Sequence, residues 1–357
     1  MEDKNEIVPK GYRENPVLLP IPPEKRLYGV TTFTFMMFSL NTCLPMFFLG
    51  PIAFSLKLTP MQAAVGAFIG NLVAVIVVIL NGYVGVKYGI PYPVQLRPSW
   101  GFRGAEIAVV LRGIVGAGWY GVEAYNASLA ILMVLLYAVG YAGRDPHAIA
   151  LASFKYVVVV VAPYVALVTY VMYKGLSAIG KVVDIAGPIL LLYFVWLLMY
   201  LHSQPEAATK IAEMSVQRVG YTSHEFAVYL AVQTNWWATI ALNISDLSRG
   251  LYKDKRGVCG LVVGPMVGIV LGQIVGTLLG YYLALLAGYV TPQEIILYKA
   301  PGTAAIVLGE LFVFLAPFST DVTANVPALL NILTSTLRLS IKWAAIGSGI
   351  IGFLVAP

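Results

Sequence analysis

Long apolar runs without a charged side chain are the feature that most limits the folds open to this chain. Residues 61–86 and 258–290 contain no Asp, Glu, Lys or Arg. A bilayer core about 30 Å thick is crossed by roughly 20 apolar residues in a helix. Charged residues make up only 11% of the 357 residues, whereas soluble domains carry about 25%. The pattern therefore predicts a membrane protein and excludes a soluble one.

Charged residues and Pro/Gly helix breakers divide the apolar sequence into nine predicted transmembrane spans. They lie at about residues 30–55, 61–86, 105–138, 148–173, 182–201, 225–247, 258–290, 303–333 and 342–357. We therefore predict an all-α polytopic membrane protein, with a polar tail at residues 1–28 and a transmembrane domain at residues 29–357. The last span reaches Pro357 with no polar segment after it, so we expect a chain truncated at its C-terminus.

Lysine and arginine are distributed unevenly between the two sides of these spans. Sixteen fall on the side of the N-terminal tail and six on the other, while Arg112 lies inside a span. Segments rich in Lys and Arg stay in the cytoplasm, so we predict a multi-pass protein of the cell membrane with a cytoplasmic N-terminus. Cys43 and Cys259 both lie in apolar segments and form neither a metal-binding spacing nor a disulfide framework.

The first predicted span carries polar residues and a helix breaker, with Asn41 followed by Pro45. Pro45 removes a backbone donor and frees carbonyls about one turn before it. Free carbonyls in mid-membrane are a ready site for a cation. The alternative is a packing kink whose free carbonyls are satisfied by a neighbouring helix.

Tryptophans and a carboxylate stand inside two other spans. Trp119 and Glu123 are four residues apart and share one helix face. An aromatic plane one turn from a carboxylate suits a flat heterocycle with N–H donors. The alternative is an interfacial tryptophan beside a glutamate that faces another helix. The sixth span holds adjacent tryptophans, Trp236 and Trp237, flanked by amides, although tryptophan is also typical of membrane interfaces.

The eighth span contains three hydroxyl side chains at helical spacing, Ser319, Thr320 and Thr323. Hydroxyls and carbonyls are hard oxygen ligands that suit a small hard cation. Membrane Ser and Thr also often bond only to the preceding turn of their own helix, and this alternative stays open.

Four motifs in order make the chain resemble the nucleobase:cation symporter-1 family. The tail from Asn15 to Arg26 is similar to the family's N-terminal signature, and the stretch YGIPYPVQLRPSWGFRGAEIAVVLRGIVGAGWYG, from Tyr88, matches its most specific motif. WAT-x-x-LNISDLSRG from Trp237 and A-x-x-ST-x-x-TAN from Ala316 match the sixth and eighth helices.

The resemblance implies a LeuT-type fold, with a five-plus-five inverted repeat inside twelve spans and with helices one and six broken. Nine predicted spans then mean that about nine of the twelve helices are present. In the family the substrate lies flat between a tryptophan of helix three and one of helix six, which correspond to Trp119 and Trp237. A helix-eight asparagine that hydrogen-bonds the substrate corresponds to Asn325.

The resemblance also implies a sodium site between helices one and eight. The helix-eight ligands correspond to the carbonyl of Ala316 and the hydroxyls of Ser319 and Thr320. We assign the helix-one carbonyls to Met37 and Leu40, and expect Asn41 to face the substrate.

Two acids depart from the family pattern. Glu123 stands where glutamine is common, and a carboxylate only accepts hydrogen bonds whereas an amide also donates. We expect Glu123 to favour a substrate edge rich in N–H, or to take up a proton during transport. Asp321 stands where asparagine is common, next to the predicted cation ligands, so it adds charge to the ion site or serves a proton pathway. Both leave Na⁺ and H⁺ open as coupling ions.

The sequence therefore predicts a secondary active transporter that imports a nucleobase-like heterocycle (a purine, pyrimidine, hydantoin or allantoin) coupled to Na⁺ or H⁺ by alternating access. The alternative within this fold is a symporter for a vitamin amine or an amino acid. An integral-membrane enzyme is disfavoured, because HExxH, Ser-His-Asp and Gly-rich phosphate motifs are absent. We expect no cofactor and no nucleic-acid partner; the expected partners are substrate, coupling cation and lipid, and the expected state is a monomer.

Overall fold

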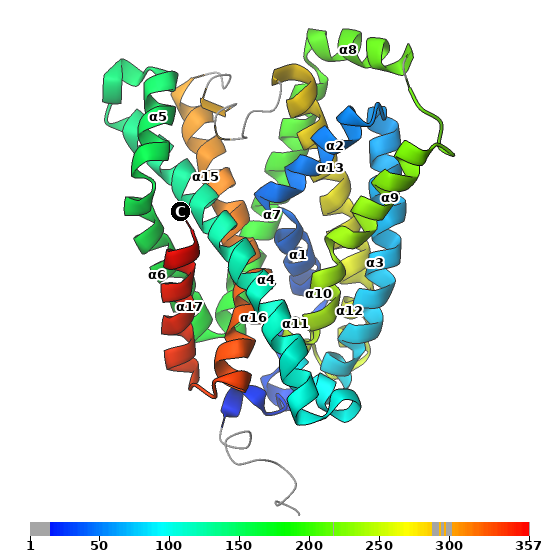
Figure 1. Ribbon diagram of the computed structural model, residues 1–357, viewed down its shortest axis with the longest axis vertical. Coiled ribbons are helices and arrows are strands. Elements are labelled where there is room, and N and C mark those ends of the chain that lie inside the picture. The colour runs from blue at the N-terminus through cyan, green and yellow to red at the C-terminus, as the bar shows by residue number, and fades with distance from the viewer. Residues whose placement is uncertain (1–14, 217, 288–292, 294–295, 298–301, 357) are drawn as a thin grey trace, which may run out of the picture.

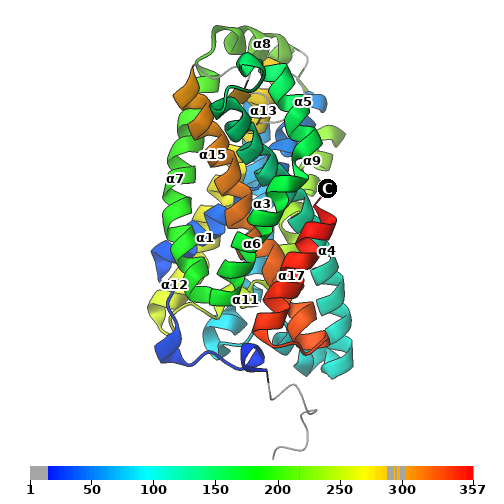
Figure 2. The ribbon, with the colours of Figure 1, turned by 90° about the vertical axis from the view of Figure 1, so that its left-hand side faces the viewer.

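The computed structural model describes residues 15–216, 218–287, 293, 296–297 and 302–356. Within them the chain forms a bundle of helices that run roughly along the long axis of the molecule (Figures 1 and 2). In the described part, five helical stretches are long and apolar enough to cross a membrane: α3 (Pro60–Tyr88), α4 (Tyr92–Ala138), α7 (Leu176–His202), Lys255–Leu286 and Thr303–Thr336.

Two further spans are bent helix pairs. The first joins α1 (Val30–Asn41) to η3 (Leu44–Phe48) and α2 (Leu49–Ser55) through a bend of 61°. The second joins α5 (Pro146–Tyr156) to α6 (Val158–Lys174) through a bend of 64°. The ninth predicted span corresponds to the shorter apolar helix α17 (Ile341–Val355).

The sixth predicted span is divided into three short helices. They are α9 (His224–Trp236), α10 (Ala238–Asn243) and α11 (Ser245–Ser248). Trp237 separates the first two and has backbone angles of φ −101° and ψ 9°, outside the helical range. The prediction that the first and sixth spans are broken is confirmed.

The break in the first span lies between Asn41 and Leu44. Cys43 is extended, with φ −62° and ψ 148°. Pro45 has no N–H to offer the carbonyl four residues earlier, so the helix ends at Asn41. The last carbonyls of a helix have no partner within it. In this chain the Ser39 carbonyl accepts from both the backbone N–H and the hydroxyl of Thr42.

The broken first span packs on a row of glycines in the seventh. This span consists of α12 (Lys255–Gly264), the π-helical η5 (Pro265–Ile269) and α13 (Val270–Ala287), and has a glycine at every fourth residue from Gly260 to Gly280. A Cβ at Gly268 would lie 2.6 Å from the Thr34 carbonyl oxygen, and one at Gly280 only 1.8 Å from that of Phe47. Rows of small residues let membrane helices approach backbone to backbone, and here only glycine fits.

The third and eighth spans also depart from regular helix. Gly101, with φ 67°, sets a first segment of α4 apart from the part that crosses the bundle, so the predicted start of this span near residue 105 is close to a real kink. The eighth span runs through α15 (Thr303–Thr320), η6 (Asp321–Asn325), α16 (Val326–Asn331) and η7 (Ile332–Thr336), of which η6 and η7 are π-helical. An additional helix, α8 (Pro205–Val216), lies across the end of the bundle farthest from residue 15 (Figure 1).

The described part of the predicted N-terminal tail is packed against the bundle. The Asn15 amide donates to the carbonyl oxygens of Thr334 (2.9 Å) and Leu339 (3.0 Å). Arg249 donates to the Val17 carbonyl oxygen at 2.7 Å. Residues 15–28 therefore form a strap that joins the eighth span to the end of the sixth.

We predict that Gly280→Ala destabilises the protein strongly, because the added methyl group would force α13 away from the Phe47 backbone. Overpacking of this kind costs about 1–3 kcal/mol, which for a chain of this size should lower the apparent melting temperature by about 5 °C. The measurement is thermal unfolding in detergent. Gly347→Ala is the control, since its Cβ would meet nothing closer than 3.5 Å; equal effects of the two changes would contradict the direct backbone contact.

Candidate functional site

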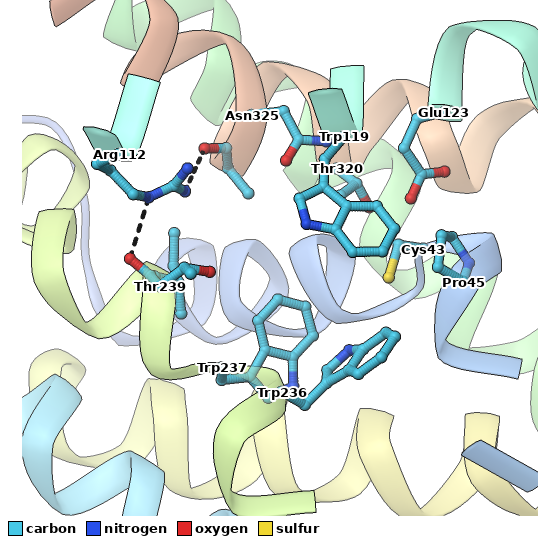
Figure 3. Close-up of a pocket in the computed structure, with 12 residues that line it drawn as sticks. Cys43, Pro45, Arg112, Trp119, Glu123, Trp236, Trp237, Thr239, Thr320 and Asn325 are labelled. Atoms are coloured by element: carbon cyan, nitrogen blue, oxygen red, sulfur yellow. Dashed lines mark hydrogen bonds between the residues drawn. The ribbon is translucent and has the colours of Figure 1, made fainter. Parts of the chain in front are cut away.

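A cavity lies where the two broken spans meet α4 and the eighth span (Figure 3). All four of these segments contribute to its wall. The lining residues are Cys43, Pro45, Arg112, Trp119, Glu123, Trp236, Trp237, Thr239, Ile240, Thr320, Ala324 and Asn325. The structure thus brings together four predicted substrate-site residues, Trp119, Glu123, Trp237 and Asn325, although they are separated by up to about 200 residues in sequence.

Trp237 forms a fixed wall of the cavity. It is 6% exposed, and its indole N–H donates to the Gln273 side chain at 2.9 Å. Gln273 in turn donates to Gln233 (2.7 Å), which donates to the Tyr229 hydroxyl (2.6 Å). This buried chain of amides holds the indole plane at the break between α9 and α10. Such networks constrain a side chain because an unpaired polar group is costly in a low dielectric.

Trp119 forms a more accessible wall. It is 39% exposed, and its nearest aromatic neighbour in the cavity is Trp236, with ring centroids 6.1 Å apart and planes tilted by 59°. Trp236 therefore belongs to the cavity rather than to a membrane interface, and it closes one side at an angle instead of presenting a parallel plane.

Glu123 and Asn325 place polar groups at the cavity wall. Glu123 is 1% exposed, and its carboxyl lies next to the Leu44 backbone N–H and the Cys43 thiol. Its Oε2 has no hydrogen-bond partner among the described residues. The Asn325 amide nitrogen donates one of its two N–H groups to Asp321 at 2.8 Å, so the amide can still accept through its oxygen and donate through its second N–H.

Asp321 faces α6 rather than the predicted cation ligands. It is fully buried, and its carboxylate accepts hydrogen bonds from the Tyr164 hydroxyl (2.6 Å) and from Asn325. This pairing orients the Asn325 amide, a role that the sequence did not reveal. Among the described residues the Asp321 carboxylate makes no hydrogen bond to the predicted cation ligands, so the expectation that it adds its charge to the ion site is not supported by a contact.

Asn41 does not line the cavity. Its amide donates to the Ile269 carbonyl oxygen in η5, and its side chain lies over Gly272, whose Cβ would come within 2.7 Å of the amide nitrogen. Asn41 therefore does not reach the cavity where we expected it to contact the substrate. Its side chain is bonded to the seventh span instead, where Gly272 leaves space for it.

Oxygen atoms of α1 and α15 meet beside the cavity, where a cation site was predicted. The Ser319 hydroxyl lies 2.9 Å from the Ala316 carbonyl oxygen and 3.3 Å from that of Ser39. The Thr320 hydroxyl lies 3.1 Å from the Ala316 oxygen, 3.2 Å from that of Ser39 and 3.4 Å from that of Leu40. These five oxygens suit a small hard cation, whose binding would turn the hydroxyl lone pairs inward.

One of the two predicted α1 carbonyls differs in the structure. The carbonyls that meet the two hydroxyls belong to Ser39 and Leu40, whereas Met37, the other predicted ligand, lies three residues, or about one turn, before Leu40. The Ser39 carbonyl replaces it because it lies nearer to the end of α1, where the helix opens.

Arg112 is the main residue of the cavity that the motifs did not single out for chemistry. A charged side chain inside a span is itself a signal, because such residues are costly in a membrane and usually functional. Arg112, Trp119 and Glu123 also follow one another at spacings of seven and four, so they share one face of α4.

Known proteins resemble this chain in sequence and in fold. Residues 20–357 match the family described as "Permease for cytosine/purines, uracil, thiamine, allantoin". The chain is 27% identical to a purine-uracil permease of Arabidopsis thaliana over 99% of its own length and 59% of the relative's. It is also 27% identical to an allantoin permease of Bacillus subtilis over 70% of its own length and 52% of the relative's. The chain thus spans between half and three-fifths of these relatives.

Solved structures show the same fold. Mhp1, described as a nucleobase-cation-symport-1 family transporter and solved in a closed conformation with bromovinylhydantoin bound, matches with a TM-score of 0.79 at 19% identity, over 95% of this chain and 74% of Mhp1. MhsT in complex with L-phenylalanine matches with a TM-score of 0.65 at 13% identity, over 93% of this chain and 79% of MhsT. The predicted LeuT-type fold class is therefore confirmed.

We predict that Cys43 reports access to the cavity. Cys259, the other cysteine, is exposed, so the test uses Cys259→Ser protein, in which a small thiol reagent can label only Cys43. Trp119→Ala should raise the labelling rate several-fold, because it removes the accessible wall. Trp196→Ala is the control, since Trp196 is 52% exposed on α7 and does not line the cavity; the same increase in both variants would show that labelling does not pass through the cavity.

Proposed function

The chain belongs to the family of permeases for cytosine and purines, uracil, thiamine and allantoin, and we propose that it is a secondary active transporter that imports a nucleobase-like heterocycle. The observation that carries this proposal is the cavity between Trp119 and Trp237, with Glu123 and Asn325 at its wall. Aromatic planes recognise the π-face of a flat ring, and a few polar groups at its edges give orientation.

The hydrogen-bonding groups support a substrate that carries N–H donors. Asn325 offers its amide oxygen as an acceptor, while one of the two N–H groups of the amide is held by Asp321. Glu123 offers the Oε2 atom that has no partner among the described residues. A ring stacked between the tryptophans would direct its N–H groups to these two acceptors. The purine-uracil permease and the allantoin permease that this chain resembles point to the same chemical class.

Coupling to Na⁺ or H⁺ is the second part of the proposal. Sodium would bind the carbonyls of Ser39, Leu40 and Ala316 and the hydroxyls of Ser319 and Thr320. Thr320 also lines the cavity, so the ion would lie next to the substrate. Binding would join α1 to α15 and stabilise the conformation in which the cavity is complete, and each ligand would then raise the affinity for the other.

We propose that transport proceeds by alternating access, and the breaks in the first and sixth spans support this. The two halves of the first span, and those of the sixth, meet at the cavity. In our proposal each half moves independently of the other half of the same span. We propose that the end of the bundle with residues 15–28 faces the cytoplasm, because the positive charges of the sequence gather on that side, and that the protein acts as a monomer. A thermal-shift panel of nucleobases, hydantoins, allantoin and amino acids, in sodium and in potassium, tests the substrate class; stabilisation by amino acids alone would overturn it.

The stacking arrangement predicts that Trp119→Ala and Trp237→Ala each reduce substrate affinity by about 1–3 kcal/mol, the value of one base–aromatic stack. Trp236→Ala should reduce substrate affinity less, because the Trp236 ring is tilted by 59° from Trp119 and closes one side of the cavity. Binding of the best ligand of the panel, measured by calorimetry, decides the matter. Equal losses in all three variants would refute the assignment of Trp237 as the stacking partner.

The ion site predicts that the double variant Ser319→Ala/Thr320→Ala loses sodium-stimulated binding and keeps weak sodium-independent binding. Both changes remove hydroxyl ligands and leave the carbonyls in place. Thr334→Ala is the matched control, since among the described residues its hydroxyl bonds to the Leu330 carbonyl four residues earlier and to no other group. If the parent protein binds substrate equally well in sodium and in potassium, sodium coupling is wrong and protons become the leading candidate.

The acceptor role of Glu123 predicts that Glu123→Gln shifts preference toward substrates whose edge both donates and accepts. The amide keeps the shape of the carboxyl but adds an N–H donor. Affinities for an N–H-rich ligand and for one with a mixed edge are compared in the two proteins between pH 5 and 8, together with their pH profiles. An unchanged preference and identical profiles would mean that Glu123 only fastens α4 to the broken first span.

A further inference from the structure

Arg112 brings a guanidinium group to the cavity wall that the proposed stacking and ion sites do not use. Its side chain is 5% exposed and lines the cavity with Trp119 and Asn325 (Figure 3). A buried arginine requires partners for its N–H groups, because leaving a charged donor unpaired inside a protein is costly.

The hydrogen bonds of Arg112 account for only part of the guanidinium. Nε donates to the Thr239 carbonyl oxygen (3.0 Å) and to the Asn243 side-chain oxygen (2.9 Å). Nη2 donates to the Ala324 carbonyl oxygen (3.1 Å). Nη1 has no partner among the described residues. One end of the guanidinium is therefore anchored, and Nη1 is a buried donor whose hydrogen-bonding capacity the described residues do not satisfy.

The charge of Arg112 is not matched by an adjacent carboxylate. Its partners are neutral oxygens, and in the described part of the chain no acid lies within 4 Å of it. The nearest link to an acid is indirect: Asn243, which accepts from Nε, donates its own amide to Asp246 at 3.2 Å. The side of the guanidinium that faces away from Asn243 therefore has no counter-charge in contact.

The buried Nη1 nitrogen lies where α4 meets the eighth span, near the cavity-lining residue Asn325. Gly116 is one turn beyond Arg112 in the direction of Trp119, and a Cβ on it would lie 3.2 Å from Nη1. Glu123 stands a further two turns along the same face, and Figure 3 shows Arg112 and Glu123 on opposite sides of Trp119. Eleven residues of helix separate their backbones by about 16 Å, which leaves room for a ring between the two side chains.

We propose that Arg112 determines specificity, and that the preferred substrate is an anionic, oxo-rich heterocycle whose negatively charged edge binds Arg112 while an N–H group binds Glu123. This inference rests on the proposed function and names the class of substrate within it. A charge-assisted hydrogen bond to guanidinium is roughly twice as strong as a neutral one. An anion would also supply a counter-charge in direct contact with Arg112, which the described residues do not, whereas a neutral ring would not.

Two ring-matched probes test the proposal at pH 7: barbiturate, which is anionic, and uracil, which is neutral. The parent protein should bind barbiturate at least about tenfold more tightly than uracil. Arg112→Gln should lower barbiturate affinity by about 10- to 100-fold and uracil affinity by less than about threefold. Arg112→Lys keeps the charge without the planar fork, so it should retain part of the preference for barbiturate.

Arg103→Gln is the control for long-range charge, because Arg103 is exposed on the same helix and does not line the cavity. It should leave the ratio of the two affinities unchanged. A parent protein without preference for barbiturate, or an equal loss of both ligands in Arg112→Gln, would overturn the proposal. If Arg112→Gln is not recovered folded, the parent protein and Arg112→Lys carry the test, and either a parent protein without the preference or an undiminished preference in Arg112→Lys is the overturning result.

Trp119→Ala separates this inference from the function on which it rests. Stacking predicts that this variant weakens both ligands. If it weakens both while Arg112→Gln leaves their ratio unchanged, the anionic class is wrong and the stacking cavity stands. If Trp119→Ala leaves both affinities unchanged, the proposed function itself fails at this cavity.

Discussion

The contact on which the rest of the structure depends is the direct backbone packing of the broken first span on the glycine row of the seventh. Gly268 and Gly280 meet the carbonyl oxygens of Thr34 and Phe47, on either side of the break, at distances that admit no side chain. Both halves of the span are therefore fixed against the same neighbouring span, on either side of the interruption between them. The carbonyls of Ser39 and Leu40, at the end of α1, meet the hydroxyls of α15 beside this interruption.

Buried polar pairs then orient the side chains around that interruption. Gln273 holds the indole of Trp237, Asp321 holds the amide of Asn325, and Asn243 holds one side of Arg112. In a low dielectric each pair is expensive to break, so the cavity wall is preorganised before a ligand arrives. The cost of ordering these groups is met on folding and not on binding.

Thr320 connects the two halves of the proposed mechanism. Its hydroxyl lies among the carbonyls of α1 and α15, and its side chain also lines the cavity. A cation at that position and a substrate in the cavity would both contact Thr320, and both would lie beside the break in the first span. Coupling then needs no long path through the protein, because both ligands would stabilise the same contact between α1 and α15.

The sequence by itself determined the membrane class, the break near Pro45 and the face shared by Trp119 and Glu123, since apolar run length, proline and helical periodicity are local properties of a chain. The family resemblance carried by its motifs also predicted the LeuT-type fold class and the break in the sixth span. Only the tertiary structure decided that Asn41 turns to η5 and that Ser39 rather than Met37 meets the α15 hydroxyls. It also decided that Arg112 lines the cavity and that its Nη1 is buried without a partner among the described residues. These outcomes depend on how two helices approach each other and on which partner is nearest. Periodicity gives the face of a side chain but not the neighbour that competes for it.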